Sequence, residues 1–126
     1  MPFSVLLTIS GILGLVFGAG FFISPAWTLR LYGASTGEVG YLMARFTGAG
    51  LFHLGIVYLM VRDVRDAVTV RRLAIASALG SLAGLRAALY AVRNDLVNDL
   101  GWSSVAIYGS LALGFAWFAF RPPRAA

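Results

Sequence analysis

Two arginines lie inside long apolar stretches of the sequence, where a permanent charge is costly. Arg45 falls in YLMARFTGAGLFHLGIVYLM, residues 41–60, and Arg86 falls in GLRAAL. An ionisable side chain within a membrane-spanning helix is a candidate functional residue, because lipid does not solvate it. The guanidinium fork binds planar oxygen acceptors. The two arginines could therefore hold a lipid phosphate, a carboxylate or the carbonyl of a quinone.

His53 is the only histidine of the chain and lies in the same stretch as Arg45. A ring nitrogen of His53 could hydrogen-bond a serine or a backbone carbonyl of a neighbouring helix. It could instead ligate a haem iron or a chlorophyll magnesium, with Ala49 leaving room for a flat ring, or it could transfer a proton. We favour the structural hydrogen bond and retain His53 as a candidate metal or pigment ligand.

The sequence offers no constellation of catalytic residues. The chain contains no cysteine, and one histidine alone cannot build a zinc site. The acidic residues lie at the ends of the apolar runs or between them, so none can orient His53 beside a serine nucleophile. A P-loop and a dinucleotide fingerprint are also missing. We therefore predict that the protein is not an enzyme.

The composition indicates an integral membrane protein. Of the 126 residues, 60% are hydrophobic and 12% are charged, whereas soluble domains average about 25% charged residues. The net charge of +5 comes from arginine, because the chain has no lysine. No basic stripe interleaves with aromatic residues, so we do not predict binding to nucleic acid.

Four apolar runs have the ~20 residues that a helix needs to cross a bilayer. We predict helices at residues 3–23, 39–61, 73–92 and 102–120. Helix is the expected state because each backbone amide in lipid must be satisfied within its own segment. The first run lacks a basic segment before it, so we interpret it as a retained helix. The predicted fold is an all-α membrane protein, a bundle of four transmembrane helices forming one domain, 1–126.

The arginines outside the spans predict the orientation of the bundle. The connection at residues 62–72 and the C-terminal tail carry six of them, Arg62, Arg65, Arg71, Arg72, Arg121 and Arg124, whereas the other two connections carry Arg30 and Arg93. By the positive-inside rule, the arginine-rich connection and both termini are cytoplasmic. We therefore predict a multi-pass membrane protein with both termini in the cytoplasm.

This orientation puts several polar residues at one depth. Arg45, Arg86 and Tyr108 each lie about six residues, or ~9 Å, from the outer end of a span. Tyr90 lies one turn above Arg86 on the same helical face. If Arg45 faces the bundle interior, it shares an acceptor with Arg86 and Tyr108. We predict a ligand-binding set in the outer leaflet, comprising Arg45, Arg86, Tyr90 and Tyr108.

Two alternatives explain the same arginines without a ligand. Each side chain could extend along its own helix to the outer headgroups, which lie within its reach. The arginines could also pair with carboxylates near the ends of the spans, namely Glu38, Asp95 or Asp99. The sequence leaves both alternatives open.

Small residues recur at the spacing that lets helices approach closely in lipid. The pairs are Gly14 with Gly18, Gly80 with Gly84, and Ser110 with Gly114. We expect these pairs to pack helices within one bundle rather than to form the seam of a dimer.

The order of these features resembles small bacterial tetraspan proteins of unknown function, the DoxX-like and related families. The resemblance rests on FFISPAWTLRLYG, LMARFTGAGLFHLGIVYL, GLRAAL and DLGWSSVAIYGSLALGFAWF, and it covers nearly the whole chain. It implies a four-helix bundle in the inner membrane, and it supplies no agreed reaction and no catalytic residues.

The small size and short connections favour a non-enzymatic accessory or scaffold subunit of a larger membrane assembly. Its partners would be the bilayer and another membrane protein or a second copy of the chain. The alternative is a membrane-embedded binding protein for a lipid, a quinone or a tetrapyrrole pigment, built on the outer polar layer. A transporter is less favoured because the prolines lie at or outside the ends of the spans.

Overall fold

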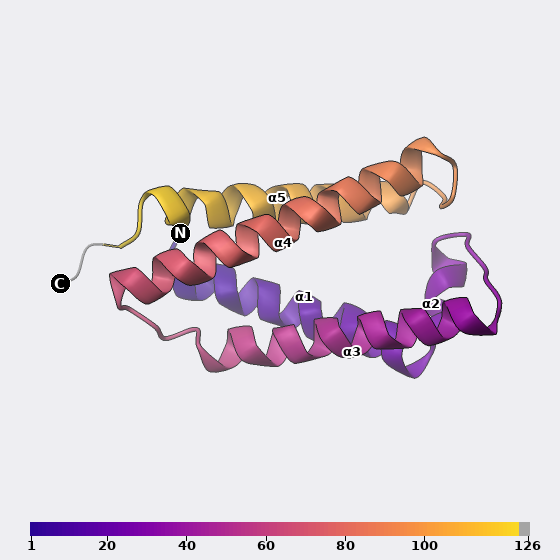
Figure 1. Cartoon of the computed structure of the whole chain (residues 1–126), viewed down its shortest axis with the longest axis horizontal. Coiled ribbons are helices and arrows are strands. Elements are labelled where there is room, and N and C mark those ends of the chain that lie inside the picture. Colours follow the sequence, from indigo (N-terminus) through magenta and orange to yellow (C-terminus); the bar gives the residue numbers. More distant parts are fainter. Residues whose placement is uncertain (124–126) are drawn as a thin grey trace.

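The computed structural model describes residues 1–123, so Arg124 lies outside the described residues. This part of the chain is all helical and contains no strand (Figure 1). The helices are α1 (Phe3–Ile23), α2 (Pro25–Leu31), α3 (Glu38–Met60), α4 (Ala67–Arg93) and α5 (Gly101–Phe120). The four longer helices are long and apolar enough to cross a membrane. The expectation of an all-helical bundle with four helices long and apolar enough to cross a membrane is confirmed.

The predicted bounds agree closely with those of α1, α3 and α5. For α4 they differ at the start of the helix. The sequence predicts a start at residue 73, whereas α4 begins at Ala67. Asp66 caps this helix, because its carboxylate accepts a hydrogen bond from the backbone N–H of Thr69 at 2.8 Å. The cap supplies an acceptor to the free N–H groups of the first turn. The polar residues before Leu73 therefore form helix rather than connection.

A short helix that the sequence analysis does not predict, α2, follows the first span. Pro25 occupies its first position, which proline tolerates because the N–H there has no partner within the helix. The Thr28 hydroxyl donates to the carbonyl of Ser24 at 2.9 Å. Ser24 and Pro25 thus end α1 and start a second helix rather than a simple loop.

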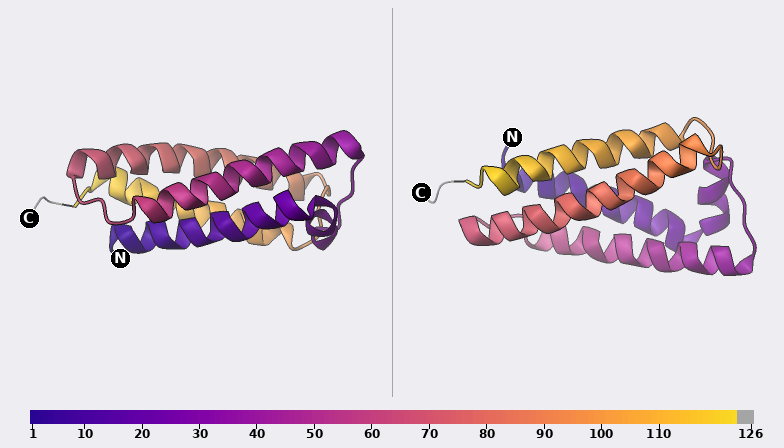
Figure 2. Two further views of the ribbon diagram at one scale, coloured as in Figure 1. Left: turned by 90° about the horizontal axis from the view of Figure 1, so that it is seen from below. Right: turned by 45° about the horizontal axis from the view of Figure 1, so that its top comes forward.

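The long helices form two antiparallel pairs, α1 with α3 and α4 with α5 (Figures 1 and 2). The start of α1, the end of α5 and the α3–α4 connection lie at one end of the bundle, the terminal end. Helix α2 and the α4–α5 connection lie at the opposite end, the α2 end. The α1–α3 seam is glycine-rich: a β-carbon on Gly18 would lie 2.8 Å from the carbonyl oxygen of Gly48. Glycine is needed at this close approach.

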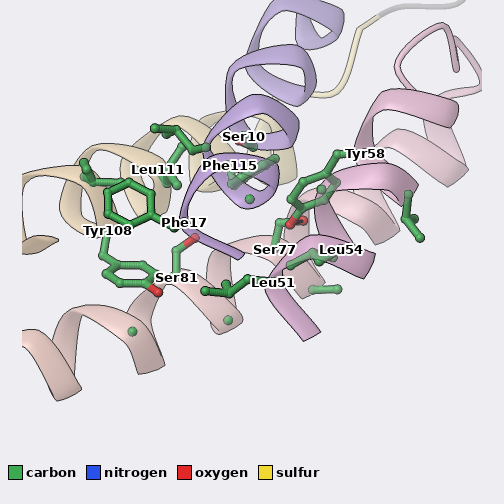
Figure 3. A pocket seen from close by; sticks show the side chains of 18 of the residues that line it. Ser10, Phe17, Leu51, Leu54, Tyr58, Ser77, Ser81, Tyr108, Leu111 and Phe115 are labelled. Carbon is green, nitrogen blue, oxygen red and sulfur yellow. Dashed lines mark hydrogen bonds between the residues drawn. The ribbon is translucent and has the colours of Figure 1, made fainter. Parts of the chain in front are cut away.

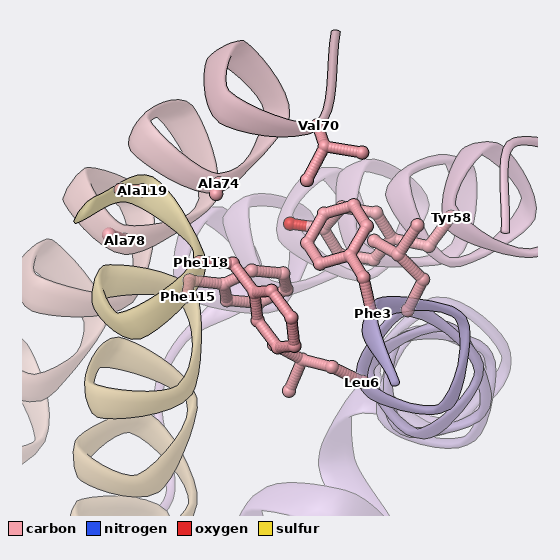
Figure 4. Close-up of a cluster of buried hydrophobic side chains, with 10 residues drawn as sticks. Phe3, Leu6, Tyr58, Val70, Ala74, Ala78, Phe115, Phe118 and Ala119 are labelled. Atoms are coloured by element: carbon pink, nitrogen blue, oxygen red, sulfur yellow. The ribbon is translucent and has the colours of Figure 1, made fainter. Parts of the chain in front are cut away.

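The hydrophobic core fills the terminal end of the bundle (Figure 4). Phe3 of α1 packs its ring against Phe118 of α5, with centroids 5.1 Å apart. Tyr58 of α3 stacks on Phe115 of α5 at 5.8 Å, and Val70 of α4 is fully buried beside them. Residues from all four long helices therefore close this end.

The α2 end is held together by hydrogen bonds between the two halves of the chain. The backbone N–H of Asn98 donates to the carbonyl of Tyr32 at 2.7 Å. The Asn98 side-chain amide donates to the carbonyl of Leu31 at 2.9 Å. The hydroxyls of Tyr32 and Ser104 lie 3.3 Å apart. The helix pairs are thus tied at both ends, and the space between them lies midway.

Candidate functional site: a cavity between the helix pairs

A cavity of about 390 Å³ lies between the two helix pairs (Figure 3). Its walls come from α1, α3, α4 and α5, on the α2 side of the aromatic core. The volume falls within the ~300–1,000 Å³ range of small-molecule sites. The cavity is the candidate functional site.

The sequence of α4 explains why this space is not filled by side chains. Apart from Leu73, which packs against the aromatic core, the α4 residues that line the cavity are small, namely Ala76, Ser77, Gly80, Ser81 and Gly84. Gly84 lies against the ring of Tyr108 in α5, which holds α4 and α5 together. From Ala76 to Gly84 these positions carry no large side chain that could fill the space, so it stays open.

Hydroxyl groups are the polar side chains of the cavity wall. They belong to Ser10 of α1, Tyr58 of α3, Ser77 and Ser81 of α4, and Tyr108 of α5. The Tyr58 hydroxyl donates to Ser77 Oγ at 2.7 Å. Ser10 is only 4% exposed, and its Oγ has no hydrogen-bond partner among residues 1–123. A buried hydroxyl without a partner costs about 1–3 kcal/mol.

The remaining lining residues are apolar, and none of the described residues on the wall is charged. A site without countercharge disfavours an ionised group, because burying an unpaired charge is costly. The wall therefore suits a neutral molecule that dissolves in the bilayer and carries at least one oxygen. The Ser10 hydroxyl can donate a hydrogen bond to such an oxygen.

Arg45 does not line the cavity. Its Nη1 donates to the backbone carbonyl of Phe22 at 2.8 Å. Phe22 lies in the last turn of α1, where carbonyls have no partner within the helix. The acceptor of Arg45 is therefore the end of a neighbouring helix. The expectation that Arg45 shares an acceptor with Arg86 and Tyr108 is not met by this geometry.

Arg86 and Tyr90 lie together on the exposed surface of α4, in a shallow groove with Arg93. Arg86 forms no hydrogen bond or ion pair with any residue between 1 and 123. Tyr108 faces the cavity instead. The predicted ligand-binding set is thus divided among three places: Arg45 at the α1 terminus, Arg86 with Tyr90 on the surface, and Tyr108 in the cavity. The role of the surface residues in binding stays a prediction.

His53 is exposed on α3 and does not line the cavity. The described residues include no group of three or more potential metal ligands. A molecule in the cavity would therefore not meet His53, and its role as a pigment or haem ligand stays a prediction for the outer surface of α3.

Ser10, Ser77 and Ser81 are site residues that the sequence alone did not predict. A signal was present in AIASALGSLAGL, where small residues recur every three or four positions along one face of the helix. We interpreted Gly80 with Gly84 as a close-packing pair, which holds for Gly84 against Tyr108. A β-carbon at Gly80 would meet no described atom within 4 Å.

No family model, curated protein or solved structure matches the chain.

Proposed function

We propose that this protein is a membrane-embedded binding protein that holds a neutral, lipid-soluble molecule, a lipid or a quinone, between its two helix pairs. The proposed role is non-enzymatic: the protein would store, present or protect the molecule. The bacterial inner membrane is the proposed location, as the DoxX-like resemblance and the arginine distribution suggest.

One observation carries this proposal: the buried Ser10 hydroxyl borders a cavity of about 390 Å³ and has no hydrogen-bond partner in the described part of the chain. Buried polar groups in folded proteins are nearly always hydrogen-bonded. A serine in a helix can also bond to its own backbone, and no such bond of Ser10 is present among residues 1–123. A carbonyl or hydroxyl oxygen of a bound molecule would satisfy it.

The test is native mass spectrometry of the full chain, extracted gently from the membrane, with chromatography of the organic extract. We expect a bound neutral molecule in stoichiometric amount, and an absorption spectrum would distinguish a quinone from a lipid. Ser10→Ala should weaken retention by a factor between about 2 and about 12, because one neutral hydrogen bond is worth about 0.5–1.5 kcal/mol.

Ser110→Ala is the matched control, since Ser110 is an exposed serine of α5 outside the cavity wall. It should retain the molecule as the wild type does. A chain that leaves the membrane carrying only disordered detergent and bulk phospholipid would contradict the proposal.

A second candidate is the accessory-subunit role, and the exposed groove on α4 favours it. Arg86 and Tyr90 are polar residues on a surface that faces either lipid or a partner, and Tyr90 is 64% exposed. Such residues are rarely left facing lipid. The same gentle extraction tests this role, because a stable partner would comigrate with the chain, and replacing Arg86 by glutamine should release it.

A further inference from the structure

The wall of the cavity is thinnest between α3 and α4. Leu54 of α3 lines the cavity and is nevertheless 44% exposed. Ala76 and Gly80 of α4 also line the cavity and are exposed on the surface. Residues that face both the cavity and the outside mark an opening. In a membrane this opening faces the acyl chains, because it lies midway along the spans.

The opening follows from how the helices pair. Helices α3 and α4 are consecutive in the chain, but each packs mainly on another helix, α3 on α1 and α4 on α5. They meet through the Tyr58–Ser77 hydrogen bond near the terminal end. Beyond it their ribbons separate toward the α2 end (Figure 1 and the right view of Figure 2). On that stretch α4 presents Gly80, whose missing side chain leaves open space.

The other sides of the cavity are better covered. At the terminal end the way is closed by the buried aromatic core around Phe115. At the α2 end the hydrogen bonds of Asn98 tie α2 to the α4–α5 connection. On the side between α1 and α5, the larger side chains Phe17, Ile107 and Leu111 line the wall and are half-buried.

We infer that the bound molecule exchanges laterally with the bilayer through the gap between α3 and α4, and that Gly80 lines this gap. This inference rests on the proposed binding function and adds the shape of the ligand. A cavity of about 390 Å³ lies near the lower limit of small-molecule sites. It can hold the oxygen-bearing end of a long neutral molecule, while the apolar remainder of that molecule extends through the gap into the bilayer.

The experiment follows the loading of the cavity in lipid nanodiscs containing the full chain. The probe is hexadecanol carrying a photoreactive diazirine, delivered from vesicles and flashed at increasing times. Peptide mass spectrometry separates adducts on cavity residues from adducts on the outer surface, which serve as an internal standard. Wild type is compared with Gly80→Phe, which places a ring in the gap, and with Gly50→Phe.

Gly50 is the matched control because it is exposed on α3 and lies outside the cavity wall, and a β-carbon there also meets no described atom within 4 Å. We expect Gly80→Phe to slow labelling of the cavity on the order of tenfold relative to the surface, about 1.4 kcal/mol in barrier. Gly50→Phe should leave the rate unchanged. Ala76→Leu narrows the same gap with a smaller group and decides the question if Gly80→Phe folds poorly.

Equal loading rates in wild type, Gly80→Phe and Ala76→Leu would overturn the lateral route. Failure of the binding function gives a different result: cavity residues in the wild type would acquire no adducts even after long equilibration, while the surface was labelled. Cavity adducts at the end point with unchanged rates in the variants would thus leave the binding function intact and refute only the route.

Discussion

At the scale of single residues, the two arginines within the long apolar helices have different environments although the sequence presents them alike. Arg45 donates to a carbonyl in the last turn of α1, where a cation is also favoured by the helix dipole. Arg86 lies on the surface of α4 without a described partner. The sequence predicts the position of both residues along their helices. It could not indicate their acceptors, because these depend on which helix lies beside which.

Arg45→Leu should lower the stability of the bundle by about 1 kcal/mol, since the Phe22 carbonyl loses a charged donor near an exposed surface. Arg86→Leu should be neutral or stabilising, because a leucine facing lipid replaces a charge. The measurement is thermal unfolding in detergent micelles, followed by circular dichroism. If the two substitutions had the same effect, the Arg45–Phe22 bond would not contribute to stability.

At the scale of helices, the spans were predictable because hydropathy belongs to the residues themselves. The start of α4 was not, because Arg71 and Arg72 suggest a connection while Asp66 and Thr69 form a cap. Helix α2 was missed because Ser24–Pro25 indicates only that α1 ends. The cavity was missed because it results from missing side-chain volume on α4, which matters only once the other pair is in place.

The Asp66 cap should make the stability of α4 depend on pH. The side-chain hydrogen bond from Thr69, and then the Thr69 backbone N–H, lower the pKa of the Asp66 carboxyl. Because the folded pKa is the lower one, the contribution is complete above the unfolded value and is lost as pH falls through the folded value. The unfolding temperature should therefore fall as the pH is lowered from neutral to about pH 3.

Asp66→Asn is the control for this dependence, since asparagine keeps a neutral acceptor at the cap. Its unfolding temperature should fall less with acid than that of the wild type, because the remaining carboxylates are common to both proteins. An identical fall in the two proteins would show that the charge of Asp66 is not involved.

At the scale of the whole molecule, the bundle has two distinct ends, and the arginines of the terminal end predict which one faces the cytoplasm. Arg62, Arg65, Arg71, Arg72 and Arg121 lie at the terminal end, and Arg30 and Arg93 lie near the α2 end. We predict that both chain ends are cytoplasmic. Alkaline phosphatase, which is active only in the periplasm, should be inactive when fused to the C-terminus, and a fluorescent protein fused there should fold.

An active phosphatase fusion at the C-terminus would show that the orientation is the opposite of the predicted one. The cavity and its gap would keep their geometry, but the surface groove with Arg86 would then face the cytoplasmic leaflet. A fusion inserted in the α4–α5 connection should give the opposite reporter pattern in either case, which controls for expression.

The aromatic core also has a consequence for the order of assembly. Phe3 belongs to the first turn of α1, and its ring partner Phe118 belongs to the last turn of α5. The α1–α3 and α4–α5 pairs are each continuous in sequence and can form as the chain emerges, since segments generally fold in the order of synthesis. The two hairpins can join around Phe3 only after α5 has been made. We therefore expect the newly made first hairpin to keep its aromatic end uncovered, with its glycine seam already complete, until α5 has been synthesised.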